Sequence, residues 1–231
     1  HMPGLQAKKV SLLYYKNSSL ALALDRLFVA CDKAYYAGAN ILILSDRGVD
    51  ENHIAIPSLL AVSAVQQYLV RTKKRTAISI ILESAEPRDV HHFATLFGYG
   101  ASAVNPYLAQ DCIGELIAGG ALNKDYYAAV DAYNKAILDG VMRIASKMGI
   151  SSMQSYEGAQ IFEAVGICKD VVDRYFTNTV SRVGGIGLQE INEAVLWRHD
   201  RAFDPMDLTA DLTVDSSGFH KLRSGSDMED H

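Results

Sequence analysis

Cysteine is scarce in this sequence, and the shortage argues against a disulfide-stabilised protein and against a cysteine-based zinc or redox site. The 231 residues include only 3 cysteines, Cys31, Cys112 and Cys168, which lie far apart in the chain. No two of them have the spacing of a zinc site or a redox motif, and an odd number cannot form a complete disulfide framework. Their surroundings are apolar and helical in pattern, so we expect packing residues in a reduced, cytoplasmic protein.

Long apolar runs and an excess of positive charge are also missing. No stretch approaches the roughly 18 consecutive apolar residues that a membrane-spanning helix needs. Lysine and arginine number 22 against 27 aspartates and glutamates, which gives a net charge of −5 at pH 7. We therefore expect neither nucleic acid nor an anionic membrane as the main partner. Hydrophobic residues make up 49% of the chain, which is enough to form a sizeable core.

The predicted fold is organised around residues 40–50. Four consecutive apolar residues, Ile41 to Leu44, end abruptly at Ser45, which is typical of a strand buried on both faces of a parallel sheet. Further strands are predicted at residues 9–15, 76–82 and 103–104, and helices at residues 18–38, 57–72, 87–98 and 108–117. Strands that alternate with helices predict an α/β fold with a parallel sheet and right-handed crossovers.

The second half of the chain is predicted to be mainly helical. Apolar residues recur at helical spacing over residues 124–148 and predict one long amphipathic helix. An irregular stretch with a short helix around Gln160 follows, and then helices at residues 169–176 and 188–199. From Asp204 the composition turns polar, so residues 209–231 are predicted to be extended or disordered. The predicted division is a parallel α/β core at 1–122, a helical extension at 123–204 and a polar tail at 205–231.

Polar side chains follow three of the predicted strands, at the point where each strand ends. Asp46 and Arg47 come after the first of these strands, Glu83 after the second and Asn105 after the third. The carboxyl ends of neighbouring parallel strands meet at one edge of a sheet, so we expect these side chains to face one rim. No acid–base pair can be assigned from the spacing. Asp46 and Arg47 could instead pair with each other or cap the following helix.

Three further features are expected to be structural. Residues 73–75, Lys-Lys-Arg, are expected to form a solvated turn. Residues 184–187, Gly-Gly-Ile-Gly, lack the spacing of a phosphate-binding loop and follow no clear strand, which favours a flexible connector. His91 and His92 would point about 100° apart on a helix and cannot easily share a metal ion. The residues alone therefore indicate no catalytic, cofactor-binding or metal site.

Several long stretches, in order along the chain, resemble the central domain of the glutamate synthase large subunit. They are residues 41–50 (ILILSDRGVD), 56–62 (IPSLLAV), 91–93 (HHF) with 98–101 (GYGA), and 103–108 (AVNPYL). Residues 155–166 (SYEGAQIFEAVG) and 217–223 (SGFHKLR) are similar to the approach to the flavin domain of that family. The resemblance extends from about Leu20 to the last residue.

The resemblance implies a fold like an incomplete (β/α) barrel. It also implies a parent enzyme that transfers the amide nitrogen of glutamine to 2-oxoglutarate, using FMN and a 3Fe–4S cluster. No catalytic or cofactor-binding residue of that enzyme has a counterpart in this chain, so we expect an inactive fragment without a cofactor of its own. Its partners would be the glutaminase and FMN domains of the parent chain. The fragment would connect them and help form the ammonia path, with Asp46, Arg47, Glu83 and Asn105 as rim contacts.

Two alternatives from other functional classes stay open at this point. A free-standing (β/α) domain could bind a flavin or a phosphorylated ligand at the carboxyl ends of its strands, as residues 73–75 and 184–187 suggest. An interaction module could instead dock a partner through the long helix at residues 124–148, if its apolar face were exposed.

Overall fold

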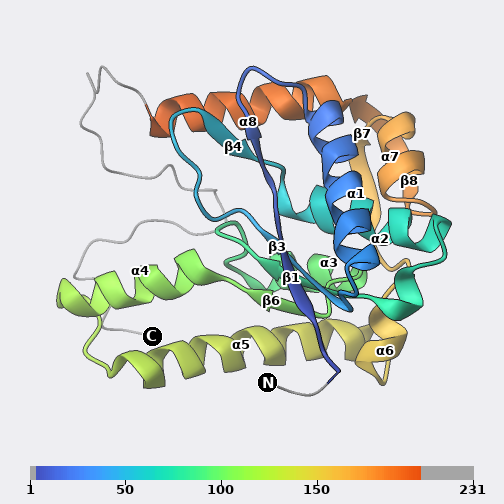
Figure 1. Ribbon diagram of the computed structural model, residues 1–231. Coiled ribbons are helices and arrows are strands. Elements are labelled where there is room, and N and C mark those ends of the chain that lie inside the picture. The colour runs from blue at the N-terminus through green and yellow to red at the C-terminus, as the bar shows by residue number, and fades with distance from the viewer. Residues whose placement is uncertain (1–3, 204–231) are drawn as a thin grey trace.

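A four-stranded parallel sheet lies at the centre of the protein, in a computed structural model that describes residues 4–203 (Figure 1). Each of its strands is followed along the chain by at least one helix, so the predicted parallel α/β fold is confirmed. In spatial order the strands are β1 (Ala7–Ser11), β3 (Ile41–Ser45), β5 (Ser79–Glu83) and β6 (Ala103–Asn105). The helices of this half are α1 (Leu20–Tyr36), α2 (Ser58–Arg71), α3 (Val90–Gly98) and α4 (Tyr107–Ala118), with a short 3-10 helix at Arg75–Ala77.

One face of the sheet is much better buried than the other. Leu42, Leu44 and Leu82 are inaccessible to solvent and pack in the main core with residues of α1 and α2. Successive side chains of a strand point to opposite faces, so Ile43 and Ile81, which are partners in the register, lie on the other face. These two isoleucines are only half-buried. The core therefore lies on the side of α1 and α2.

Side-chain caps set where several helices begin. Ser19 caps α1 by accepting a hydrogen bond from the backbone N–H of Leu22 at 3.2 Å. Asp89 accepts hydrogen bonds from the first N–H groups of α3, so that helix starts three residues after Pro87 rather than at the proline. The first N–H of α2, at Ser58, donates to the carboxylate of Glu86 at 2.6 Å. A cap from a distant loop thus ties α2 to the carboxyl end of β5.

The strand predicted at residues 9–15 is divided between two sheets. The backbone N–H of Leu12 still donates to Ser45 of β3 at 2.8 Å, but its carbonyl accepts from Ile56 at 3.0 Å. The chain therefore changes partners at residue 12. Residues Leu13–Tyr15 form β2, which pairs antiparallel with β4 (His53–Ala55) in the loop that follows β3.

The second half, as far as residue 203, contains two strands that the sequence did not predict. Its elements are α5 (Tyr126–Lys147), α6 (Met153–Tyr156), β7 (Glu163–Ile167), α7 (Lys169–Tyr175), β8 (Val180–Ile186) and α8 (Leu188–Ala202). The short helix is α6, and Gln160 instead has a left-handed backbone with φ of 55°. The predicted connector at residues 184–187 is wrong, because most of it belongs to β8, which pairs in parallel with β7. The predicted tail, residues 205–231, lies outside the described residues.

Gly185 of β8 allows the two strands to approach closely. A Cβ atom added there would lie 2.2 Å from the carbonyl oxygen of Gly166, which is too close for any side chain. Gly185→Ala is therefore expected to break the β7–β8 pairing and to speed amide hydrogen exchange in β8. Gly184→Ala is the matched control, because nothing lies within 4 Å of its Cβ position. Equal exchange in the two variants would contradict this account.

The long helix α5 lies beside α3 and α4 (Figure 1). Ile137 and Val141 of α5 pack with Phe93 and Ala94 of α3 in a second, smaller core cluster. The apolar stripe that predicted this helix is therefore partly occupied within the chain. None of the described helices is both long enough and apolar enough to cross a membrane.

Candidate functional site

The carboxyl ends of the four parallel strands line up residue by residue. Across the sheet, Ser11 is the partner of Ser45, Ser45 of Glu83, and Glu83 of Asn105. Asp46 and Arg47 follow Ser45 directly. The structure thus brings the four residues singled out in the sequence to one edge of the sheet, which we call the rim.

Glu83 is the centre of one hydrogen-bond network on the rim. Its carboxylate accepts hydrogen bonds from Ser45 Oγ at 2.6 Å and Arg47 Nε at 2.8 Å. Lys9 Nζ of β1 forms an ion pair with the same carboxylate at 2.9 Å. The hydrogen bond from Ser45, with the two cations, lowers the pKa of Glu83 to about 2. Glu83 is therefore held ionised and links three strands.

Asp46 is the centre of a second network, and it is buried with only 4% of its surface exposed. Its carboxylate accepts hydrogen bonds from Ser84 Oγ at 2.6 Å, the backbone N–H of Ala85 at 2.9 Å and the hydroxyl of Tyr107 at 2.8 Å. These donors follow β5 and begin α4. Asp46 therefore neither pairs with Arg47 nor caps the next helix, and both structural alternatives weighed for it are wrong.

Arg47 and Tyr107 join the two networks. The guanidinium carbon of Arg47 lies 3.8 Å from the centre of the Tyr107 ring, within the range of a cation–π contact. Burial, with the hydrogen bond to Asp46, raises the pKa of Tyr107, so its hydroxyl stays protonated as a donor. The side chain of Asn105 is exposed and makes no hydrogen bond within residues 4–203, while its carbonyl accepts from the N–H of Ser84 at 3.1 Å.

The low pKa of Glu83 predicts a specific loss of stability in acid. The pKa of Glu83 falls from an ordinary 4.5 to about 2 on folding, so its stabilising effect is complete above pH 4.5. The effect is lost as the pH falls from about 4.5 to about 2. Glu83→Gln is expected to flatten the pH dependence of the free energy of unfolding across this window, measured by urea denaturation at several pH values. Glu115→Gln, an exposed carboxylate on α4, should leave the slope unchanged; a Glu83→Gln slope like wild type would disprove the assignment.

Four residues that bond to the carboxylates of Asp46 and Glu83 were not predicted from the sequence. Ser45 and Ser84 sit beside the residues they bind, and a serine adjacent to a strand-end carboxylate is a usable signal. Lys9 and Tyr107 carried no such signal, since each is far from its partner in sequence. Only the parallel register and the start of α4 bring them to the rim.

The basic turn at residues 73–75 is not simply solvated. Lys74 is buried and forms an ion pair with Asp32 at 2.6 Å, close to the rings of Tyr36 and Tyr68. Arg75 forms an ion pair with Glu157 at 3.2 Å. Both cations are therefore engaged in holding α1 and the α6 region against the core.

The glutamate synthase central domain family matches residues 1–168, which is most of the chain. The chain belongs to this family. This central domain is 50% identical over 201 residues to the NADPH-dependent glutamate synthase large chain of Bacillus subtilis, covering 87% of this chain and 13% of that protein. It is 34% identical over 231 residues to the NADH-dependent glutamate synthase of Schizosaccharomyces pombe, covering 98% of this chain and 11% of that protein.

A ferredoxin-dependent relative also aligns with nearly the whole chain. The central domain is 38% identical over 239 residues to ferredoxin-dependent glutamate synthase 2 of Synechocystis, covering 96% of this chain and 15% of that protein. The chain therefore spans well under a fifth of the length of the relatives it matches, although nearly all of it aligns. Relatives named for NADPH, for NADH and for ferredoxin all share this segment.

The central domain's own residues do not fit an iron–sulfur cluster. Cys31 is buried in the core, where burial raises its thiol pKa to about 12, and Cys112 is exposed on α4. Cys168 precedes α7, so the three thiols belong to three separate elements. Within residues 4–203, no three His, Cys, Asp or Glu side chains lie close enough together to hold a metal ion.

Proposed function

We propose that this central domain is a scaffold within a glutamate synthase, which transfers the amide nitrogen of glutamine to 2-oxoglutarate to give glutamate. The domain connects the glutaminase and FMN domains of the parent chain and forms part of the wall of the ammonia path. In this proposal residues 1–122 are the core, and residues 123–204 extend toward the FMN domain. Membership of the family and the small fraction of each relative that the chain covers support this role.

The observation that carries the proposal is the incompletely covered face of the parallel sheet. On this face Ile43 and Ile81 are half-buried, and Lys9 and Ala103 are exposed. Parallel sheets in complete domains are covered on both faces. We therefore expect the face that carries Ile43 and Ile81 to pack against another part of a larger protein. Glu83 lies on the same face, which makes the polar rim the border of that contact.

The chemistry of the rim suits a wall better than a catalytic centre. Each carboxylate of Asp46 and Glu83 already accepts from three protein donors. The pKa of Glu83 is lowered to about 2, which does not suit a general acid or base at pH 7. A closed wall of fixed polar groups would keep ammonia from escaping to water between the two sites of the parent enzyme.

The two features that suggested a flavin or phosphate site are both accounted for structurally. Lys74 and Arg75 are held in ion pairs, and Gly185 is required for the close approach of β7 and β8. This weakens the free-standing ligand-binding alternative.

A flavin titration separates the two functions. Purified chain is added to dilute FMN, with riboflavin as the control that lacks the phosphate, and flavin fluorescence is followed. The scaffold proposal expects no saturable quenching at micromolar protein and no formation of glutamate from glutamine by the chain alone. Saturable quenching that depends on the phosphate would overturn the scaffold proposal in favour of a flavin site at the strand ends.

A further inference from the structure

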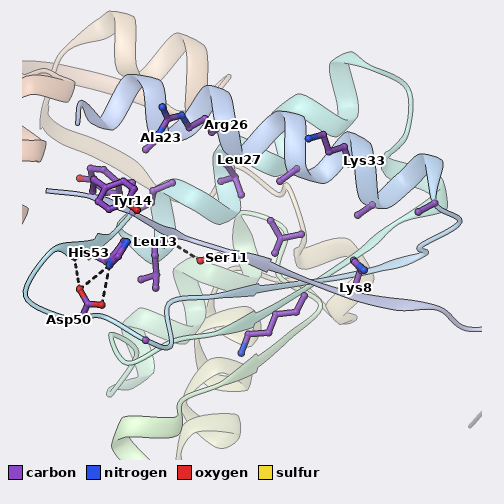
Figure 2. Close-up of a pocket in the computed structure, with 18 residues that line it drawn as sticks. Lys8, Ser11, Leu13, Tyr14, Ala23, Arg26, Leu27, Lys33, Asp50 and His53 are labelled. Carbon is purple, nitrogen blue, oxygen red and sulfur yellow. Dashed lines mark hydrogen bonds and ion pairs between the residues drawn. The ribbon is translucent and has the colours of Figure 1, made fainter. Parts of the chain in front are cut away.

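A small pocket beside the C-terminal ends of α2 and α3 has a lining unlike that of the larger groove along β1. In the groove, about 850 Å³ in volume, cationic side chains lie along β1 and α1, and Asp50 and His53 close one end (Figure 2). The pocket has a volume of about 190 Å³, and none of its described lining residues carries a charge. A phosphate or carboxylate group would therefore find no counter-ion among them.

The pocket has an aromatic wall that is fixed by contacts within the chain. Tyr156 is inaccessible to solvent, and its hydroxyl donates to a backbone carbonyl of α3 at 3.1 Å. The hydroxyl of Tyr99 is hydrogen-bonded to Thr179 Oγ1 at 2.8 Å. The Phe162 ring lies against Gly98, where an added Cβ atom would come within 2.6 Å of it. Three rings are thus held in place before any ligand binds, which suits a planar molecule.

The polar part of the lining consists mainly of side-chain amides. They belong to Gln66, Gln67, Gln160 and Asn178. Within residues 4–203, the last three of these amides form no hydrogen bond, and Gln66 uses only its oxygen, which accepts from Arg75. An amide offers a donor and an acceptor side by side, so it can pair with a ligand edge that carries the complementary groups, as nucleobase edges do.

Two of the four amide residues have an unusual backbone conformation. Gln160 and Asn178 are left-handed, with φ of 55° and 67°, and Lys73 is the one other non-glycine residue with positive φ in residues 4–203. This conformation costs energy for a residue with a Cβ atom, less for asparagine than for glutamine, and glycine avoids the cost. Residues of this kind cluster at binding sites. The chain therefore keeps an amide side chain at two positions where glycine would fold at least as easily.

We propose that this pocket binds a small, neutral, planar heterocycle whose edge carries adjacent hydrogen-bond donors and acceptors, as the nucleobases do. The rings of Tyr99 and Phe162 contact its faces, and the free amides pair with its edge. The pocket is smaller than the roughly 300–1,000 Å³ of drug-sized sites, which limits the ligand to about one ring. No residue of the rim lines the pocket, so this site can be tested separately from the scaffold role.

An NMR titration of the complete 231-residue chain with uracil and with cytosine tests the proposal. We expect saturable shifts of the side-chain amide signals of Gln67, Gln160 and Asn178 with at least one of the two bases, at the millimolar concentrations that suit so small a ligand.

Two relatives of uracil serve as chemical controls. Dimethyluracil, with both ring nitrogens methylated, lacks the N–H donors, and orotate adds a carboxylate to the same ring. Each should bind roughly tenfold or more weakly than uracil. The proposal is overturned if neither base gives a saturable shift, or if either control binds as tightly as uracil.

Glycine substitutions separate binding from folding. Gln160→Gly keeps the left-handed backbone and removes the amide, so the urea midpoint should stay the same or rise while the affinity for the bound base falls by roughly tenfold. Lys73→Gly makes the same backbone change outside the pocket and should leave the affinity unchanged. An unchanged affinity in Gln160→Gly would overturn the proposal. A lower urea midpoint together with weaker binding would also overturn it, because the side chain would then act only by supporting the fold.

Discussion

Asp46→Ala is expected to lower the free energy of unfolding by about 3–5 kcal/mol, because three hydrogen bonds to one buried carboxylate are lost and their donors are left unsatisfied. The substitution leaves the Ser84 hydroxyl, the Ala85 N–H and the Tyr107 hydroxyl without their acceptor. Because Asp46 is only 4% exposed, water cannot easily replace the carboxylate. Equilibrium denaturation in urea measures the change.

Two further variants show whether the effect has the proposed cause. Glu51→Ala removes an exposed carboxylate from the same loop and should change stability by less than about 0.5 kcal/mol. Tyr107→Phe removes one of the three donors and should cost about 1 kcal/mol. A loss for Asp46→Ala no larger than that for Glu51→Ala would show that the network does not hold the rim together.

Gly140→Ala is expected to destabilise the protein by about 1–3 kcal/mol, the usual cost of overpacking a well-filled contact. A Cβ atom at this position of α5 would lie 2.4 Å from Cγ2 and 2.6 Å from Cγ1 of Val90, at the start of α3. Valine is branched at Cβ and cannot swing aside, so the two helices must move apart. The higher helix propensity of alanine, worth about 1 kcal/mol, offsets only part of this cost.

A compensating substitution and a control glycine test whether the Gly140 contact causes the loss of stability. Val90→Ala in the same chain makes room for the new methyl group, so the double variant should be more stable than Gly140→Ala alone. Gly114→Ala on α4 meets the Tyr126 ring only at an ordinary 3.6 Å, so it should be neutral or stabilising. Equal effects of the two glycine substitutions would contradict the packing argument.

The rim residues could be found from the sequence because each lies where a strongly apolar strand ends. The run from Ile41 to Leu44 and its abrupt end at Ser45 placed Asp46 and Arg47 correctly, and the same reasoning placed Glu83 and Asn105. What the sequence could not supply was the bonding pattern. The partners of Asp46 include Tyr107, 61 residues away, and a tyrosine after Asn-Pro gives no sign that its hydroxyl turns back to β3.

The two features that the sequence analysis misjudged, strand β8 and the turn at residues 73–75, also have physical explanations. Every residue of β8 is exposed and two are glycines, so the strand lacks the apolar run or alternation by which buried strands are found. The turn at residues 73–75 resembled a solvated basic turn because the partner of Lys74, Asp32, lies 42 residues earlier on α1. In both cases tertiary contacts, rather than local sequence, determine the structure.

The most direct test of the scaffold proposal is the coupling ratio of a complete glutamate synthase that carries substitutions in this rim. The measured quantity is the amount of 2-oxoglutarate consumed per glutamine hydrolysed, with ammonia released to solution assayed in parallel. Arg47→Ala and Asn105→Ala, alone and combined, are expected to lower the ratio and release ammonia while glutamine hydrolysis continues. Glu51→Gln, the exposed control, should keep the wild-type ratio. A ratio that stays at the wild-type value in the combined variant would contradict a role for this rim in the ammonia path.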